Sequence, residues 1–328
     1  MTPDDGASRR RRLLKRLLLM PEISGLVLLV LIVAGFSWVA PNFMSMRSVV
    51  NIVNILPELG LVALGTTILI IAGEFDLSVG SVFALAPMAM LWLVSVGAPV
   101  PVAMLLPLVL AGGIGAINGL VTLRFGIPSF IATLGMLFIA RSLAVILANL
   151  TPTSFPETLP VWLLVARMGR VQASVLWLLG ICVVCGIILH RTRLGNWIYA
   201  TGGAQQAARD MGINTRAVKL TAFTMCSALA GFAGMIQTFR IQSPLATAGD
   251  GIELQAIAGA VIGGTALSGG IGSVLGALLG TVLLRVIDNG MTMARVDANW
   301  FQLAVGLLTV LSVVINVVIR GRAARMRA

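Results

Sequence analysis

The sequence predicts an all-α polytopic membrane protein with about ten transmembrane helices, from its composition and from its recurring apolar stretches. Of its 328 residues, 58% are hydrophobic and only 11% are charged, and the mean hydropathy is +1.00. Soluble domains carry roughly 25% charged residues, so this chain has too few charges to cover a surface in water. A helix crosses a bilayer with about 20 apolar residues. Stretches near this length occur at residues 23–40, 56–72, 79–96, 102–123, 128–147, 171–189, 220–239, 252–267, 274–287 and 300–319.

The basic residues sort by side when the chain crosses a membrane ten times with its N-terminus in the cytoplasm. Sixteen of the 23 basic residues then lie inside. Five lie outside, namely Arg47, Arg167, Arg170, Arg240 and Arg295, while Arg141 and Arg285 lie within or at the edge of spans. This bias follows the positive-inside rule and puts both termini in the cytoplasm. The net charge of +11 is therefore explained by membrane topology and does not indicate nucleic-acid binding.

Composition divides the chain into three parts. Residues 1–20 form a basic cytoplasmic N-terminal segment, residues 21–320 a transmembrane domain, and residues 321–328 a basic cytoplasmic tail. Within the transmembrane domain, residues 191–219 form the longest polar segment, and the topology places this loop inside.

The two halves of the chain resemble each other, which predicts two inverted five-helix repeats. Residues 115–124 (GAINGLVTLR) and 276–285 (GALLGTVLLR) are identical at six of ten positions. Each half also has an acidic residue, Asp76 or Glu253, where a Gly-rich span opens. Five spans per half would run the second copy through the membrane in the opposite sense, as in many transporters. Chance similarity between apolar helices is the alternative explanation.

Two carboxylates lie between apolar spans in the segment GEFDLSVG, residues 73–80. Because charged groups are costly where they face lipid, Glu74, Asp76 and Ser78 are candidates for a gate or a pathway lining, as is Glu253 in the second half. The alternative, which does not exclude the first, is that Asp76 or Ser78 caps the following helix.

Asn51, Asn54 and Glu58 recur at helical spacing near the start of the second span. Asn54 and Glu58 are candidate pathway residues on this ground. The same three residues could instead mark the wet boundary of the membrane.

Three further polar residues fall in or at the ends of apolar spans. Arg141 lies deep in the fifth span and needs a partner, because a bare arginine there is costly. An ion pair is favoured over a substrate contact. Gln237 and Arg240 end the seventh span on the outer side, where they either meet a partner protein or mark the interface.

No pattern of catalytic, cofactor-binding or metal-binding residues emerges. His190 is the only histidine, and Cys182 and Cys185 lie within one apolar stretch, as small buried side chains do. Neither lysine, Lys15 or Lys219, follows a glycine, so the sequence has no G-x-x-x-x-G-K-[ST] loop. The chain is therefore not expected to be an enzyme, and energy for transport would come from a partner or an ion gradient.

The polar loop 191–219 contains a short helix by sequence pattern. Gly202 and Gly203 are expected to break the chain, residues 204–211 are good helix formers, and Gly212 is a stop signal. A helix of about two turns held between two spans is suited to docking in a partner's groove. The alternative is a generic solvated loop.

Four ordered segments resemble the monosaccharide ABC-importer permeases, a family that includes ribose, xylose, arabinose and rhamnose permeases and the related autoinducer-2 permeases. They are GEFDLSVGS at 73–81, IPSFIATLG at 127–135, the AARDMGI loop, and ELQAIAGAVIGGTALSGGIGSVLGALLG at 253–280. The resemblance covers residues 40 to 320. One departure is Glu74, because the family commonly has a second glycine there, and no role is carried over to it.

The resemblance implies a type II ABC importer-like fold in the bacterial inner membrane. It also implies an ATPase-coupling helix within the permease domain, formed by Gln206, Ala207, Ala208, Arg209, Asp210, Met211, Gly212 and Ile213. The implied partners are an ABC ATPase subunit, a periplasmic sugar-binding protein and a second permease copy, identical or different. No cofactor is implied.

The expected function is import of a simple sugar, whether a pentose, hexose, deoxysugar or polyol, by alternating access. Import of autoinducer-2 or another small polar solute is the first alternative, and an ion-coupled secondary transporter is the second. A membrane-embedded enzyme is disfavoured, because no nucleophile–base or metal constellation is present.

Overall fold

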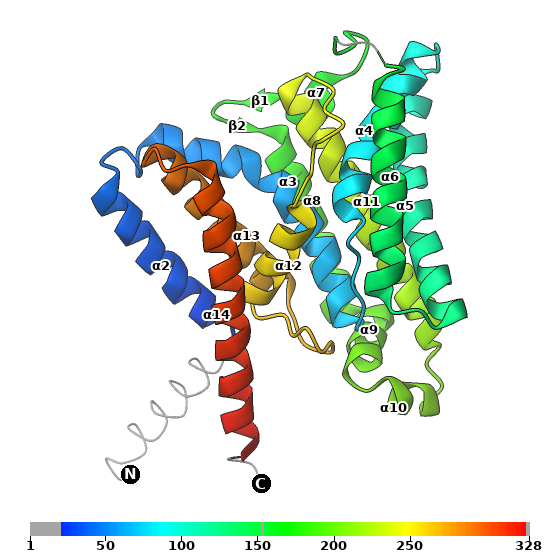
Figure 1. The fold of residues 1–328 in the computed structure, drawn as a ribbon, viewed down its shortest axis with the longest axis vertical. Helices are drawn as coiled ribbons and strands as arrows, with labels where there is room; N and C mark the ends of the chain where they lie inside the picture. The colour runs from blue at the N-terminus through cyan, green and yellow to red at the C-terminus, as the bar shows by residue number, and fades with distance from the viewer. Residues whose placement is uncertain (1–20, 152–153, 326–328) are drawn as a thin grey trace.

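The computed structural model describes residues 21–151 and 154–325, and this part of the chain is predominantly helical (Figure 1). Six helices are long and apolar enough to cross a membrane, namely α3 (Met46–Ile71), α5 (Val100–Phe125), α6 (Ser129–Ala148), α8 (Ala173–Arg191), α11 (Thr215–Ile241) and α13 (Val274–Met293). Shorter apolar segments lie on α2 (Pro21–Val39), α4 (Val79–Ser95), α12 (Ile252–Ile262) and α14 (Ala298–Arg325). The prediction of a polytopic helical membrane protein is confirmed. The basic segment predicted at 1–20 and the last three residues of the tail predicted at 321–328 lie outside the described residues, while residues 321–325 continue α14.

Helix α3 is the centre of the bundle, because it packs against α8, α11, α12 and α13. Every residue from 57 to 71 is buried, as expected for a helix that is apolar on all sides. Helix α11 lies against α3 and also packs on α4 and α5. The hydrophobic core therefore follows α3 and α11, where Phe83, Phe223 and Phe239 are fully buried.

The outer helices present apolar side chains to the surroundings. The side chains of Val109 on α5, Phe138 on α6 and Val183 on α8 are each more than half exposed, as polar residues on the surface of soluble proteins are. Apolar exposure of this extent indicates contact with lipid. The bundle thus has an apolar outer face and a mainly apolar core, which also contains buried polar residues such as Thr66, Asn118 and Ser227.

The small elements lie at opposite ends of the bundle (Figure 1). The short helix α7 (Val161–Val165) and an antiparallel hairpin of β1 (Arg167–Met168) and β2 (Val171–Gln172) lie at one end. Helices α9 (Arg193–Gly203) and α10 (Gln205–Asp210) lie at the other end, and α14 ends on that side too.

Two irregular segments interrupt the helical pattern within the bundle. Residues 72–78 connect α3 to α4, and residues 242–251 connect α11 to α12. The segments bring the first turns of α4 and α12 together, because a methyl group added at Gly80 would overlap both Gly249 and the carboxylate of Glu253. The structure also shows that the span predicted at 252–267 is too long. Helix α12 ends at Ile262, and Gly264 with a φ of 92° starts a turn.

The loop 191–219 is more helical than predicted. The short helix expected at 204–211 is α10, and the break expected at the glycine pair follows directly after it: a further helix, α9, includes both glycines and ends at Gly203, and Ala204 is not helical. Packing explains this, because Gly202 lies directly against the carbonyl group of Ile71 and against Gly270. A side chain at position 202 would separate α9 from the end of α3.

Replacing Gly234 by alanine should lower the thermal stability of the protein. The new methyl group would overlap the Phe83 carbonyl at the contact between α11 and α4. Overpacking costs about 1–3 kcal/mol, so the melting temperature in detergent should fall by several degrees. The control is Gly135→Ala, since nothing lies within 4 Å of its added methyl group. Equal melting temperatures for the two variants would contradict this packing.

Candidate functional site

Asp76 is the centre of a buried polar cluster at the start of α4. Its Oδ1 accepts hydrogen bonds from the Ser78 backbone N–H at 2.8 Å and from the Ser78 hydroxyl at 2.6 Å. Its Oδ2 accepts from Asn118 on α5 at 3.2 Å and from Ser227 on α11 at 3.1 Å. The carboxylate therefore joins three elements and satisfies the turn that leads into α4. Asp76 thus accepts a hydrogen bond from the backbone N–H of Ser78, the residue before α4, but the Ser78 hydroxyl does not cap the helix, because it bonds to Asp76 and Asn118 instead.

Helix α6 supports the same irregular segment from its other side. The Ser129 hydroxyl accepts a hydrogen bond from the Phe75 N–H at 3.2 Å, and the Thr133 hydroxyl accepts one from the Leu77 N–H at 3.1 Å. Non-helical backbone at membrane depth is tolerated only where protein groups or water satisfy it. The two hydroxyls of α6 meet this requirement for residues 72–78.

Arg141, further along α6, holds the second irregular segment. Its guanidinium forms an ion pair with Asp250 at 2.6 Å and donates to the carbonyl oxygens of Ala246 at 2.8 Å and Ala248 at 3.0 Å. It also donates to the Gly80 carbonyl at 3.3 Å, in the first turn of α4. The ion pair expected from the sequence is confirmed, with Asp250 as the partner.

The remaining candidate carboxylates lie at different places. Glu253 is half-buried in the first turn of α12, next to Gly80. Glu58 is buried within α3 and is paired with Arg240, and Gln237 donates to it at 3.3 Å. Glu74 pairs with Lys219 at 2.6 Å, at the end of the bundle that carries α9 and α10.

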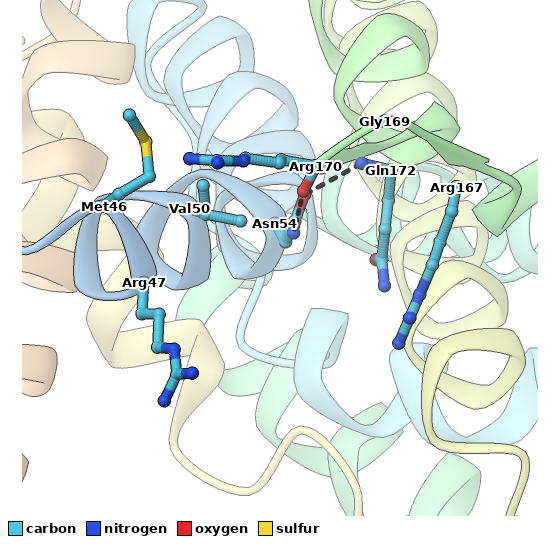
Figure 2. A pocket seen from close by; sticks show the side chains of 8 residues that line it. All are labelled: Met46, Arg47, Val50, Asn54, Arg167, Gly169, Arg170 and Gln172. Carbon is cyan, nitrogen blue, oxygen red and sulfur yellow. Dashed lines mark hydrogen bonds between the residues drawn. The ribbon is translucent and has the colours of Figure 1, made fainter.

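Asn54 fixes the β1–β2 hairpin to α3 (Figure 2). Its side-chain amide donates to the Arg170 carbonyl at 3.2 Å, and its Oδ1 accepts from the Gln172 N–H at 2.9 Å. Asn51, one turn earlier, donates instead to Asn289 on α13 at 3.1 Å. Both asparagines therefore join α3 to neighbouring elements.

A cavity of about 580 Å³ lies beside this hairpin and is lined by Met46, Arg47, Val50, Asn54, Arg167, Gly169, Arg170 and Gln172 (Figure 2). Its three arginines are exposed, and none of the four ion pairs among the described residues involves them. The sequence predicted these arginines on one side of the membrane but did not bring them together. The hairpin does so, because it folds residues 167 and 170 back onto α3.

At the opposite end, α10 and its flanking residues present a mostly exposed surface. Of the residues predicted as a coupling helix, Gln206, Ala207, Arg209, Asp210, Met211 and Gly212 are exposed, Ile213 is half-buried and Ala208 is buried. Met211 is 83% exposed. It borders an apolar recess of about 400 Å³ that is also lined by Ala200, Gly203, Ala204, Ala207, Ala208 and Ile213.

Two hydrogen bonds keep this short helix in shape. Gln206 donates to Asp210 at 3.0 Å along α10, and the Arg209 guanidinium donates to the Thr215 hydroxyl at 3.0 Å, at the start of α11. Gly212 has a φ of 82°, which a residue with a side chain rarely adopts, and the chain turns there into α11. These contacts therefore fix the position of α10 relative to the start of α11.

Comparison with known proteins assigns the class of this arrangement. The family described as branched-chain amino acid transport system / permease component matches residues 48–313. The chain therefore belongs to the permease components of ABC importers.

Individual relatives narrow the class. The chain is 36% identical to the ribose import permease protein RbsC of Escherichia coli K12 over 311 residues, 93% of this chain and 96% of that protein. It is 32% identical to the probable ABC transporter permease protein YphD of the same strain, covering 93% and 92% of the two chains. It is 31% identical to the autoinducer 2 import system permease protein LsrC of Photorhabdus luminescens, covering 88% and 87%. The chain is thus a member of the monosaccharide ABC permease family, as its motifs predicted. No solved structure matches it.

Replacing Asp76 by leucine should strongly destabilise the protein. The change leaves the Ser78 N–H, the Asn118 amide and the Ser227 hydroxyl without their acceptor in the core. Each buried group left without a partner costs about 1–3 kcal/mol, so little monodisperse protein should survive extraction in detergent. Glu157→Leu, at an exposed position in the connection before α7, is the control and should behave like the wild type. A stable Asp76→Leu variant would mean that this cluster does not hold α4 in place.

Proposed function

We propose that this chain is the permease subunit that carries a simple sugar across the bacterial inner membrane, powered by a separate ABC ATPase. The supporting observation is the meeting of the first turns of α4 and α12 at two irregular segments. In transporters, discontinuous helices of this kind form the solute site, with helix N-termini and free backbone groups directed at it.

The charges around these segments favour a neutral, hydroxyl-rich solute. Arg141 is neutralised by Asp250, Glu58 by Arg240, and Asp76 is engaged by hydrogen-bond donors. What remains is hydrogen-bonding capacity together with the half-buried carboxylate of Glu253, which can accept hydrogen bonds from hydroxyl groups, and this suits a pentose, hexose, deoxysugar or polyol. The names of the relatives point to the same substrate class, with ribose for RbsC and autoinducer 2 for LsrC.

Two inverted repeats of five spans account for the packing of the central helices. In the two repeats, α3 is equivalent to α11, α4 to α12 and α5 to α13. The observed contact between α5 and α11 then corresponds to the contact between α13 and α3, which is also observed. Likewise, α4 with α5 corresponds to α12 with α13, and α4 with α11 corresponds to α12 with α3. The similar stretches at 115–124 and 276–285 lie on α5 and α13, which exchange. We infer ten membrane-embedded helices, of which α12, with 11 residues, is about half-length and α4, with 17, is slightly short, with both termini cytoplasmic.

The ATPase subunit would dock on the surface formed by residues 206–213. This surface combines the exposed Met211 with an apolar recess, a combination that buries area efficiently against a partner. Docking there would place the ATPase on the cytoplasmic side, at the end where α14 finishes.

On the outer side, the cavity with Arg47, Arg167 and Arg170 would receive acidic groups of the periplasmic sugar-binding protein. A second permease copy, identical or different, would cover the start of α12, where Leu254 is 62% exposed beside Glu253. Sugar would then pass between the two copies as the bundles tilt.

An ion-coupled transporter is the competing function. Such a protein needs a carboxylate or histidine that is free to bind Na⁺ or H⁺ near the middle of the membrane. Glu58, Glu74 and Asp250 each have a cationic partner, and hydrogen-bond donors occupy both oxygens of Asp76, so Glu253 is the remaining candidate among the predicted pathway carboxylates. The family relationship also favours the ATP-driven machine.

Proteoliposomes should accumulate sugar only with the complete machine. The permease is reconstituted with its ATPase subunit and its binding protein, and labelled ribose, xylose, arabinose and rhamnose are tested with and without ATP. Uptake is expected with ATP and the binding protein together. Uptake by the permease alone under an ion gradient would overturn the proposal.

Two sets of variants should separate the two docking surfaces. Met211→Asp puts a charge in the apolar recess and should weaken capture of the ATPase subunit by about tenfold or more, the scale of one lost apolar anchor, while leaving binding of the sugar-binding protein intact. The double variant Arg167→Glu, Arg170→Glu should slow association with the binding protein and remove its salt dependence, while ATPase capture is unchanged. Each variant is the control for the other, with both interactions measured in nanodiscs. Loss of both interactions in either variant would contradict the assignment.

A further inference from the structure

The Lys219 side chain joins three segments that are far apart in the sequence. Its ammonium donates to Oε1 of Glu74 at 2.6 Å, on the connection between α3 and α4. It also donates to Oε1 of Gln205 at 3.1 Å, the first residue of α10. Lys219 itself belongs to the second turn of α11, and its side chain is only 7% exposed.

The ion pair between Glu74 and Lys219 keeps the two segments firmly together. The Glu74 side chain is only 13% exposed, so both charges are largely out of water. A nearly buried ammonium or carboxylate is strongly unfavourable without its partner, and the pair with its added amide oxygen satisfies both. The side chains therefore stay together unless the surrounding elements separate.

Glu74 stands two residues before Asp76 on the same irregular segment. The segment is attached on one side to α6, through Ser129 and Thr133, and on the other side to α10 and α11, through Lys219. A shift of α10 and α11 relative to α6 therefore acts on the segment through the Glu74–Lys219 pair. The polar cluster around Asp76 begins two residues further along this segment.

A second contact works in one direction only. Gly202 of α9 lies against the Ile71 carbonyl at the end of α3, without an ion pair. Such a steric contact transmits a push of α9 towards α3, but it offers no resistance when the two separate. The ion pair resists separation. The Ser227–Asp76 hydrogen bond also links α11 to the segment, but the Lys219 contact is the one that includes α10 as well, through Gln205.

We propose that Glu74 and Lys219 are positioning residues that carry the movement of α10 to the start of α4, and so to the solute pathway. This inference rests on the proposed function, since it concerns how the ATPase drives that pathway. Without the pair, the ATPase still binds and hydrolyses ATP, but less of its movement reaches the irregular segment. The consequence is a lower number of sugar molecules moved per ATP.

The decisive variant is the neutral double change Glu74→Gln, Lys219→Met. It removes the ion pair and leaves no unpaired buried charge, so it separates coupling from folding. Its melting temperature and its capture of the ATPase subunit are expected to match the wild type. The ratio of sugar transported to ATP hydrolysed is expected to fall by about tenfold, within the usual range of coupling between sites.

Two further variants complete the test in the same proteoliposomes. The charge exchange Glu74→Lys, Lys219→Glu rebuilds the pair with reversed charges and should recover most of the ratio. Arg285→Met is the matched control, because it removes the ion pair with Asp288 that lies within α13 alone. It should leave the ratio unchanged.

The outcomes distinguish this inference from the proposed function. If the wild type fails to transport any of the sugars tested, the proposed function fails. If the wild type transports sugar and the folded neutral double variant keeps the wild-type ratio, the pair has a structural role only and this inference is overturned. If the neutral double variant does not fold, the charge-exchange variant decides. This inference is also overturned if the charge-exchange variant folds but its ratio of sugar transported to ATP hydrolysed is as low as that of the single variant Glu74→Gln.

Discussion

A backbone that leaves the helical state inside a bilayer must have its polar groups satisfied by the protein itself, and this constraint organises the whole bundle. The chain leaves the helical state at residues 72–78 and again at 242–251. One helix, α6, serves both places, with the hydroxyls of Ser129 and Thr133 for the first and the guanidinium of Arg141 for the second. A helix whose outer face is apolar and exposed thus has a polar inner edge that holds the two segments together.

The same constraint explains why the interior is polar without being strongly charged. Asp76 satisfies the turn into α4 only as a hydrogen-bond acceptor, and Arg141 holds the carbonyls of the second segment only as a donor. Each of these charges is committed to backbone and side-chain partners, so it is not available to a passing ion. A pathway beside these segments meets a solute with hydrogen bonds, which a neutral polyol exchanges with water at little cost.

Local pattern predicted the helices well and their contacts poorly. Apolar length marked each helical stretch, and Gly212 marked the end of α10, because both signals are contained in a few neighbouring residues. Arg240, which pairs with Glu58, and Ser227, which donates to Asp76, both lie on α11, 182 and 151 residues away from these acids. No sequence signal near either acid predicts this partner. The sequence predicts that Arg141 needs a partner. It does not identify Asp250, because that contact depends on how residues 242–251 fold back.

Propensity failed where tertiary packing overrode it. Gly202 and Gly203 are helix breakers by preference, and α9 does end at Gly203, but Gly202 still lies within the helix, because only a residue without a side chain lets α9 approach Ile71 and Gly270 so closely. Hydropathy failed at the end of α12 for a related reason, since it counts apolar residues beyond Ile262 without registering that the glycines there form a turn.

The two ends of the molecule differ in chemistry in a way that fits the two partners proposed for them. A binding protein must arrive and leave in every cycle, and exposed arginines speed such encounters through long-range attraction without making the complex long-lived. An ATPase that stays attached through many cycles needs slow dissociation instead, which apolar burial around Met211 provides. The exposed arginines around the cavity at the hairpin and the apolar recess beside Met211 are therefore the arrangement expected for a subunit with one transient and one lasting partner. If the roles were reversed, the arginines would make a salt-sensitive attachment for the motor, and the recess would hold the binding protein too long for rapid turnover.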